Sequence, residues 1–151
     1  MSDLLIGLLS AVLATNQPAA VSNLVTQTTG LSITIPDPND PVEMEFQKLM
    51  EDDDVAQAEV EKWIRENLAF GPKGGGLTPA ELNGRIDARF STVRKAYEDF
   101  LKRHPDHARG HLAYGSFLTD IHDVEDAEPE LEKARQLDPK NPLVPNLEPN
   151  A

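Results

Sequence analysis

The stretch AYEDFLKRHPDHARGHLAYGSFLTDIHDVEDAEPELEKARQLDPKNP, residues 96–142, decides the fold that this sequence predicts. In two places a helical pattern runs into a charged turn with a proline, RHPDH at 103–107 and LDPKN at 137–141. The two prolines, Pro105 and Pro139, are 34 residues apart. Between them, apolar and small residues recur at the spacing of one helix face: Leu112, Gly115, Leu118, Ala127, Leu131 and Ala134. The stretch therefore predicts two helices that pack against each other.

These positions resemble the tetratricopeptide repeat, whose helix–turn–helix unit also has a period of 34 residues. Pro139 is taken as the proline that closes the repeat. The residues in the packing positions are then Tyr114, Gly115, Leu118, Ala127, Leu131 and Ala134. The sequence departs from the pattern at His111, where the repeat has Trp, and at Pro129, inside the second helix. The resemblance covers residues 108–139 and implies an all-α fold of stacked helical hairpins.

An earlier, degenerate repeat is expected over residues 78–107. Moving the frame back by one period places Val93, Tyr97 and Phe100 in the packing positions of the second helix. The segment TPAE at 78–81 is a capping box with Pro at the first helical position, so a helix begins there. The pair Ser91-Thr92 can cap a second start, which would divide the stretch into two helices. Residues 78–142 are thus expected as one repeat-like segment.

Charge is distributed unevenly along the chain. The 151 residues have a net charge of −12, yet residues 1–36 contain one charged side chain, Asp3. Residues 37–70 contain eleven acids and three bases. Because phosphate backbones and anionic membrane surfaces repel such a chain, we expect neither nucleic acid nor a membrane as a partner. The chain has no Cys, which excludes thiol catalysis and disulfides and leaves the compartment open.

Residues 1–36 are predicted to form an apolar helical arm and a linker. The run LLIGLLSAVLAT is apolar around most of a helix, and a second helix follows from Asn16 to about Gly30. A secretory signal would need a basic leading region, and a membrane span would need about 20 apolar residues; this run has neither. Burial against protein, in the same subunit or the next, is therefore favoured. The apolar residues expected to mediate self-assembly are Leu4, Leu5, Leu8, Leu9, Val12, Leu13, Val21, Leu24 and Val25.

The remaining segments are predicted from their local signals. Residues 37–70 are expected to form an acidic two-helix segment, because the run EDDD at 51–54 resembles a helix end followed by a cap. Residues 71–77 are predicted as a Gly-rich linker, since no strand precedes them as a phosphate-binding loop would require. Residues 143–151 form a Pro-rich tail in which a helix cannot continue.

Candidate chemical sites are few. The three histidines His104, His107 and His111 have a spacing that suits a metal, but a turn and a packing position explain them without one. The sequence lacks serine-elbow and HExxH motifs, so no nucleophilic or metallohydrolase site is indicated. We expect no enzyme, no cofactor and no metal site.

An interaction protein is therefore the expected class. Repeat hairpins leave apolar faces that neighbours or caps must cover, and the apolar arm also needs a partner. The favoured hypothesis is self-association between copies, with a filament or tube as one form. A monomeric adaptor that binds a peptide of another protein is the alternative, and an exported or membrane-tethered repeat protein is a third. A cytoplasmic location is the default, whereas a filament would also suit the cell surface or the extracellular space.

Overall fold

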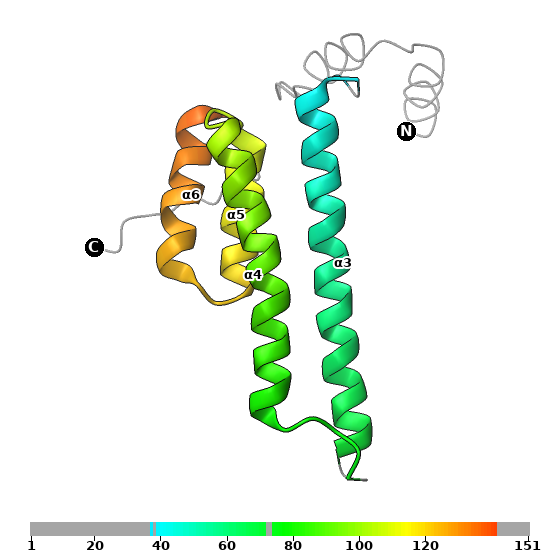
Figure 1. Ribbon diagram of the computed structural model, residues 1–151. Helices are drawn as coiled ribbons and strands as arrows, with labels where there is room; N and C mark the ends of the chain where they lie inside the picture. The colour runs from blue at the N-terminus through cyan, green and yellow to red at the C-terminus, as the bar shows by residue number, and fades with distance from the viewer. Residues whose placement is uncertain (1–36, 38, 72–73, 142–151) are drawn as a thin grey trace, which may run out of the picture. The chain divides into compact units, whose positions relative to one another are not determined.

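A computed structural model describes residue 37, residues 39–71 and residues 74–141. The chain divides into two compact units, Met1–Met44 and Glu45–Ala151. The described part of the chain is all-α and contains no strand, as the sequence predicts (Figure 1). Its helices are α3 (Pro41–Phe70), α4 (Pro79–Arg103), α5 (Ala108–Asp120) and α6 (Val124–Leu137). The predicted arm over 1–36 and the predicted tail over 143–151 lie outside the described residues.

The helix α3 is continuous over 30 residues, so the prediction of two helices within residues 37–70 is wrong. Its buried side chains are alternately three and four residues apart and run straight through the acidic stretch at 51–54: Phe46, Leu49, Asp53, Ala56 and Val60. Neither Gly nor Pro occurs between Val42 and Phe70 to end the helix. The start of the helix is capped by the Asp40 carboxylate, which accepts a hydrogen bond from the Val42 N–H at 2.8 Å.

The helix α4 is also uninterrupted, over 25 residues. Its start has the predicted capping box: the Thr78 hydroxyl accepts the Glu81 N–H at 3.3 Å, and the Glu81 carboxylate accepts the Thr78 N–H at 2.9 Å. Thr92 does not cap a second helix, because its hydroxyl donates back to the Ala88 carbonyl at 3.2 Å. The helix–turn–helix repeat expected over 78–107 is therefore wrong, and that stretch forms one helix.

The helix α3, which precedes α4 in the chain, packs against it. Several side-chain contacts join the two helices, and in the following four the residue number falls along α3 as it rises along α4: Arg85 with Trp63, Arg89 with Glu59, Tyr97 with Asp53 and Arg103 with Glu45. This order makes α3 and α4 an antiparallel hairpin, visible as the two long helices of Figure 1.

The helices α5 and α6 form a second, shorter hairpin of 13 and 14 residues. The turn between them, residues 121–123, includes His122 with a φ of 65°. The helix axes come close at Gly115, where an added Cβ would lie 2.7 Å from Leu131 side-chain carbons. Pro129 is accommodated inside α6 without ending it.

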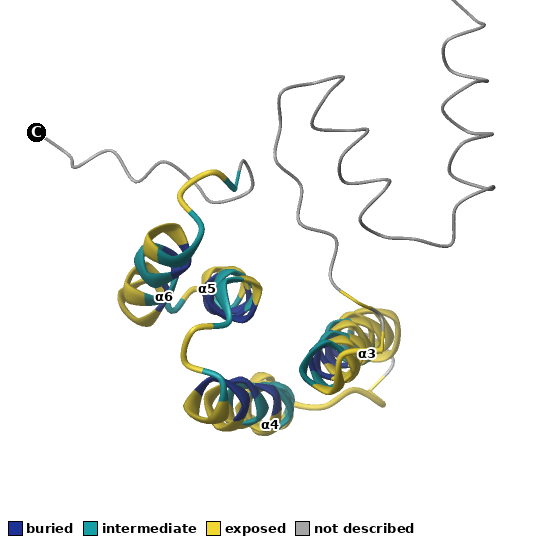
Figure 2. Ribbon diagram, turned by 90° about the horizontal axis from the view of Figure 1, so that it is seen from above, coloured by how far each residue is buried: buried dark blue, intermediate teal, exposed yellow. Residues whose placement is uncertain are grey.

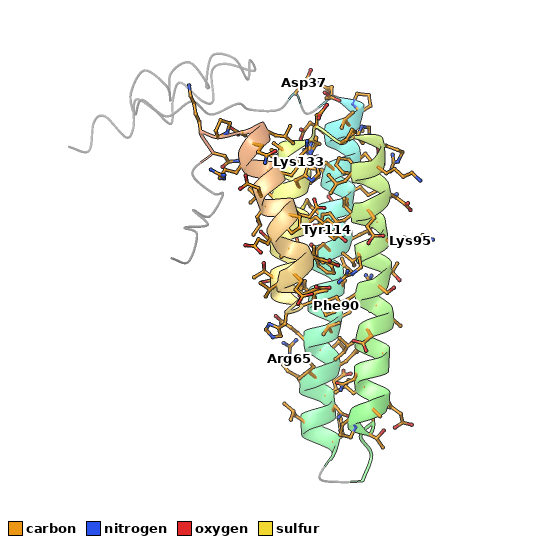
Figure 3. The ribbon with its side chains drawn as sticks, turned by 90° about the vertical axis from the view of Figure 1, so that its left-hand side faces the viewer. Asp37, Arg65, Phe90, Lys95, Tyr114 and Lys133 are labelled. Carbon is orange, nitrogen blue, oxygen red and sulfur yellow. The ribbon has the colours of Figure 1, made fainter. Side chains whose placement is uncertain are left out.

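Aromatic rings fill the core between α3, α4 and α5. The ring of Phe46 lies 5.7 Å from that of Phe100, and the Tyr97 ring stacks on Tyr114 at 5.2 Å and meets Phe117 at 5.6 Å. Figure 2 shows that the buried side of each helix faces its neighbours and that the opposite side is exposed. Side chains project along the whole length of α3 and α4 (Figure 3), but the buried ones lie between Phe46 and Val60 on α3 and between Val93 and Leu101 on α4.

Candidate interaction surfaces

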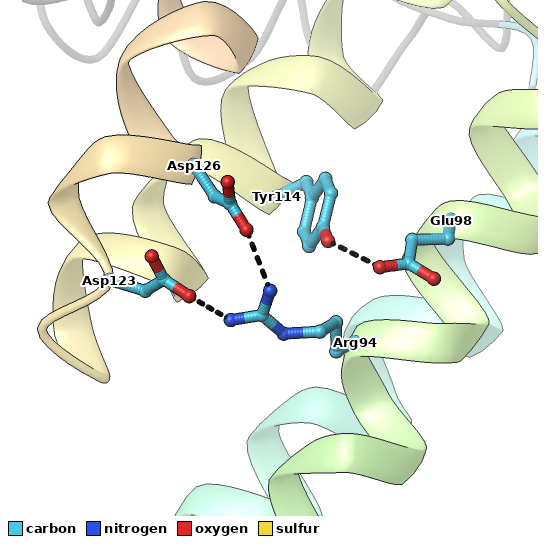
Figure 4. A network of polar contacts seen from close by, with 5 residues as sticks. All are labelled: Arg94, Glu98, Tyr114, Asp123 and Asp126. Atoms are coloured by element: carbon cyan, nitrogen blue, oxygen red, sulfur yellow. Dashed lines mark hydrogen bonds and ion pairs between the residues drawn. The ribbon is translucent and has the colours of Figure 1, made fainter.

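A polar network joins the middle of α4 to α5 and to the start of α6 (Figure 4). The Arg94 guanidinium forms ion pairs with Asp123 and, at 2.9 Å, with Asp126. One turn along, the Tyr114 hydroxyl donates to Glu98 at 3.1 Å. The hydrogen bond from Arg94 holds the pKa of Asp123 below its usual range. The network therefore fixes the second hairpin against α4.

His111 is a buried histidine with two acceptors. Its Nδ1 lies 2.5 Å from the Glu130 carboxylate, and its Nε2 lies 2.9 Å from the Pro105 carbonyl oxygen. Burial lowers the pKa of His111, but the bonds to Glu130 and Pro105 outweigh it, so the pKa is raised. Both ring nitrogens can donate at once only in the imidazolium form. His111 thus ties the turn before α5 to α6.

The other two histidines of the spaced set have separate roles. His107 caps α5, since its Nδ1 accepts the Gly110 N–H at 2.9 Å. The Nε2 of His104 lies 3.2 Å from Glu45 on α3. The three histidines therefore bond to different partners, and no grouping of three metal-ligand side chains occurs among the described residues.

Asp53 is the buried acid of α3, with 7% of its surface exposed. Its carboxylate accepts the Tyr97 hydroxyl at 2.7 Å and lies 3.4 Å from the Gln57 amide nitrogen. Burial raises the pKa of Asp53, and these hydrogen bonds offset only part of the effect. Burial likewise raises the pKa of Tyr97. Like the Arg94 and His111 contacts, this pair connects helices.

The residues predicted to pack in the repeat lie between α5 and α6 or beside them. Six of them are buried: Tyr114, Gly115, Leu118, Ala127, Leu131 and Ala134. Pro139 is exposed and follows the C-cap of α6, Asp138. The predicted self-assembly residues between Leu4 and Val25 lie outside the described part of the chain.

Exposed apolar side chains gather where α3 turns into α4. We call this region the hairpin tip and define it by Ile64, Leu68, Phe70 and Leu77. All four are exposed, Leu68 by 72%. The hairpin tip lies at the end of the α3–α4 hairpin that extends past α5 and α6, which cover only its other half (Figures 1 and 3). Nothing in the described residues covers this apolar end.

The turn at the hairpin tip is held in place by Asn67. Its side-chain oxygen accepts the Leu77 N–H at 2.6 Å, and its amide nitrogen donates to the Leu77 carbonyl at 3.2 Å. Beside it, a pocket of about 330 Å³ has both apolar and polar walls, lined by Trp63, Glu66, Asn67, Phe70, Gly75, Gly76, Leu77 and Arg85. The Arg85 guanidinium lies over the Trp63 ring at 3.9 Å from its centroid. Aromatic residues and Arg of this kind are enriched at protein interfaces.

The outer sides of the remaining helices are mostly charged. On α6 the exposed residues include Glu125, Asp126, Glu128 and Arg135, with Val124 as the exposed large apolar side chain. On the middle of α3, Val55 is exposed between acids and other polar residues. Among the described residues, Met44, Val55 and Val124 are the large exposed apolar side chains outside the hairpin tip. The other four such side chains all belong to the hairpin tip.

The sequence pattern alone does not reveal the hairpin tip. Ile64 and Leu68 follow Val60 and Trp63 at helical spacing, which is typical of a buried helix face. Burial also requires a neighbouring element, and the sequence pattern of one helix does not show where that neighbour ends. One feature of the sequence does point to an exposed end. The stripe of apolar residues along 41–70 is unbroken, which predicts a helix longer than those of the α5–α6 hairpin.

Comparisons of this chain with known protein families, with functionally characterised proteins and with solved structures find no match. In the part of the chain that the structure describes, none of the helices combines the length and apolar character needed to span a membrane.

Proposed function

We propose that this chain is a non-enzymatic interaction protein that self-associates through the apolar residues of its N-terminal arm. The observation that carries this proposal is the contrast in charge: residues 1–36 contain one charged side chain, whereas the described helices expose charge densely on most faces. A water-exposed surface normally carries many charges, so an uncharged segment of this length is suited to contact with protein.

The helical framework supports the same class of function. We assign α5 and α6 to a hairpin of the tetratricopeptide type, on the basis of their lengths, their short turn and the close approach at Gly115. The buried titratable groups Asp53 and His111 bond to neighbouring helices and to the turn before α5. Such a framework presents surfaces to other chains.

Contact between the arm of one copy and the helices of another is heterologous. Repetition of one heterologous contact generates a ring if the rotation closes and a filament if it does not. Either assembly follows from the same interface, so the proposal does not depend on the symmetry.

The test is the mass of the full chain in solution. Light scattering over about 1 to 100 µM, a range typical of moderate affinities, is expected to show mass rising with concentration. Negative-stain imaging then distinguishes rings from filaments. A monomer over the whole range would contradict the proposal and favour an adaptor for another protein's peptide. A double variant, Leu5→Asp with Leu9→Asp, is expected to stay monomeric, because it places charges in the apolar arm.

A further inference from the structure

We propose that the hairpin tip receives residues 4–13 of a second copy of this chain. This inference rests on the proposed self-association and names the surface that it uses. The contact joins two apolar elements that the same sequence supplies, one at the end of the α3–α4 hairpin and one in the N-terminal arm.

The hairpin tip is an apolar surface without a cover. Along α3 the last buried residue is Val60, and along α4 the first is Val93. Between them, the four residues of the hairpin tip expose large apolar side chains, and the pocket beside Trp63 opens next to them. Asn67 holds the turn through two hydrogen bonds to Leu77, so the surface is formed before a partner binds.

Among the described residues near the hairpin tip, four charged side chains form two ion pairs, and a fifth contacts an aromatic ring. Arg65 bonds to Glu61 at 3.0 Å, and Lys62 lies 3.9 Å from Glu66. Arg85 lies over the Trp63 ring. A partner therefore gains little from bringing a charge of its own, and an uncharged apolar segment suits this surface better than an acidic or basic peptide.

Residues 4–13 have the matching chemistry. Their sequence, LLIGLLSAVL, contains no charged side chain and five leucines. As a helix it would be about 15 Å long and would present leucines at i, i+4 and i+5 to a groove, which is a common mode of helix recognition. The other exposed apolar residues, such as Val55 and Val124, lie among charges and offer no comparable surface.

The receiving surface belongs to a second copy because the proposed self-association places the arm and its partner surface on different copies. Residues 14–40 join the segment to α3, and Leu68 lies about 40 Å from Pro41 along the helix, at 1.5 Å per residue. Contact within one chain would fix these 27 residues along α3, at a cost in conformational entropy. A second copy binds without that constraint.

The first experiment compares matched single substitutions in the full chain. Leu68→Asp places a charge on the hairpin tip, and Val55→Asp places the same charge at an exposed position of the same helix outside it. Because hot-spot residues dominate an interface, Leu68→Asp is expected to weaken assembly by about tenfold or more, and Val55→Asp is expected to assemble like the wild type. Circular dichroism checks that both variants keep their helices, and Leu68→Ser provides a second change without charge.

The second experiment asks whether the two surfaces bind each other. The Leu5→Asp, Leu9→Asp variant keeps an intact hairpin tip, and Leu68→Asp keeps an intact arm. Each alone is expected to be monomeric, and their mixture is expected to form a one-to-one dimer, since one good interface remains. Trp63 is the chain's single tryptophan and lines the hairpin-tip pocket, so its emission is expected to shift to shorter wavelength in that dimer.

The outcomes separate the two proposals. A wild-type chain that stays monomeric contradicts the proposed function and this inference with it. A wild-type chain that assembles while Leu68→Asp assembles equally well overturns the hairpin tip alone. A mixture of the two deficient variants that remains monomeric, with unshifted Trp63 emission, also overturns it, because an intact arm and an intact hairpin tip then do not bind each other.

Discussion

At the scale of single residues, two buried titratable side chains are expected to change the folding stability in opposite directions as pH changes. His111 has a raised pKa and Asp53 also has a raised pKa, but one is charged when protonated and the other when deprotonated. Protonation of His111 therefore favours the folded state, whereas ionisation of Asp53 opposes it. Each effect can be isolated by comparing the wild type with a variant at several pH values.

His111→Gln is expected to lower the free energy of unfolding by about 1–3 kcal/mol at pH 6, since it removes a charged bond to Glu130. The folded-state pKa is above the unfolded value of about 6.5, so the stabilisation is complete below that value and is lost as pH rises through the folded-state pKa. Urea unfolding at about pH 6 and pH 9 measures the difference. His122→Asn, at an exposed turn position with positive φ that Asn tolerates, is the control for loss of a histidine and is expected to be about as stable as the wild type. A deficit that grows toward alkaline pH would contradict the assignment.

Asp53→Asn is expected to keep an acceptor for the Tyr97 hydroxyl and to remain within about 1 kcal/mol of the wild type. Because the pKa of Asp53 is raised on folding, its ionisation costs stability as pH rises above about 4, so the variant should gain on the wild type from pH 4 to pH 7. Asp53→Leu leaves the buried hydroxyl without a strong acceptor and should cost about 1–3 kcal/mol. Equal stability of the Asn and Leu variants at pH 7 would show that the hydrogen bond contributes nothing.

At the scale of elements, the helix boundaries were predictable where a local signal sets them. The capping box at Thr78 and the proline turn at residues 103–107 mark the limits of α4. The error in α3 has a tertiary cause: the acidic run resembles a cap, but Asp53 is buried against Tyr97, 44 residues away. The hairpin tip was missed for the same kind of reason, since the extent of α5 and α6 decides which part of α3 is covered.

The close approach of α5 and α6 at Gly115 predicts a position-specific effect of alanine. Gly115→Ala places a Cβ 2.7 Å from Leu131 and is expected to cost about 1–3 kcal/mol through overpacking. Gly84→Ala is the matched control on α4, where the added Cβ has no neighbour within 4 Å, and should raise stability by about 0.5–1 kcal/mol. Chemical denaturation of both variants tests the pair. A stabilising Gly115→Ala would mean that the helices are not held at this distance.

At the scale of the whole molecule, the net charge of −12 opposes any association of copies. The proposed contact lies where that opposition is weakest, because residues 4–13 carry no charge and the described charges beside the hairpin tip include the ion pairs Arg65–Glu61 and Lys62–Glu66. The uneven distribution of charge along the chain thus permits an apolar contact while the charged helices keep other faces of the copies apart. The balance between charge repulsion and the apolar contact can be changed without altering the sequence.

Salt is therefore expected to strengthen self-association. Raising NaCl from about 20 mM to about 300 mM shortens the Debye length from about 20 Å to about 6 Å, which screens the repulsion between acidic copies. The apolar contact itself is not screened, so the dissociation constant should fall several-fold in light scattering or sedimentation. Variant Leu68→Asp, measured in parallel, should remain weak at both salt concentrations, since the penalty of placing a charge in an apolar contact is not removed by salt. Weaker association at high salt would contradict this and would indicate an interface held by ion pairs.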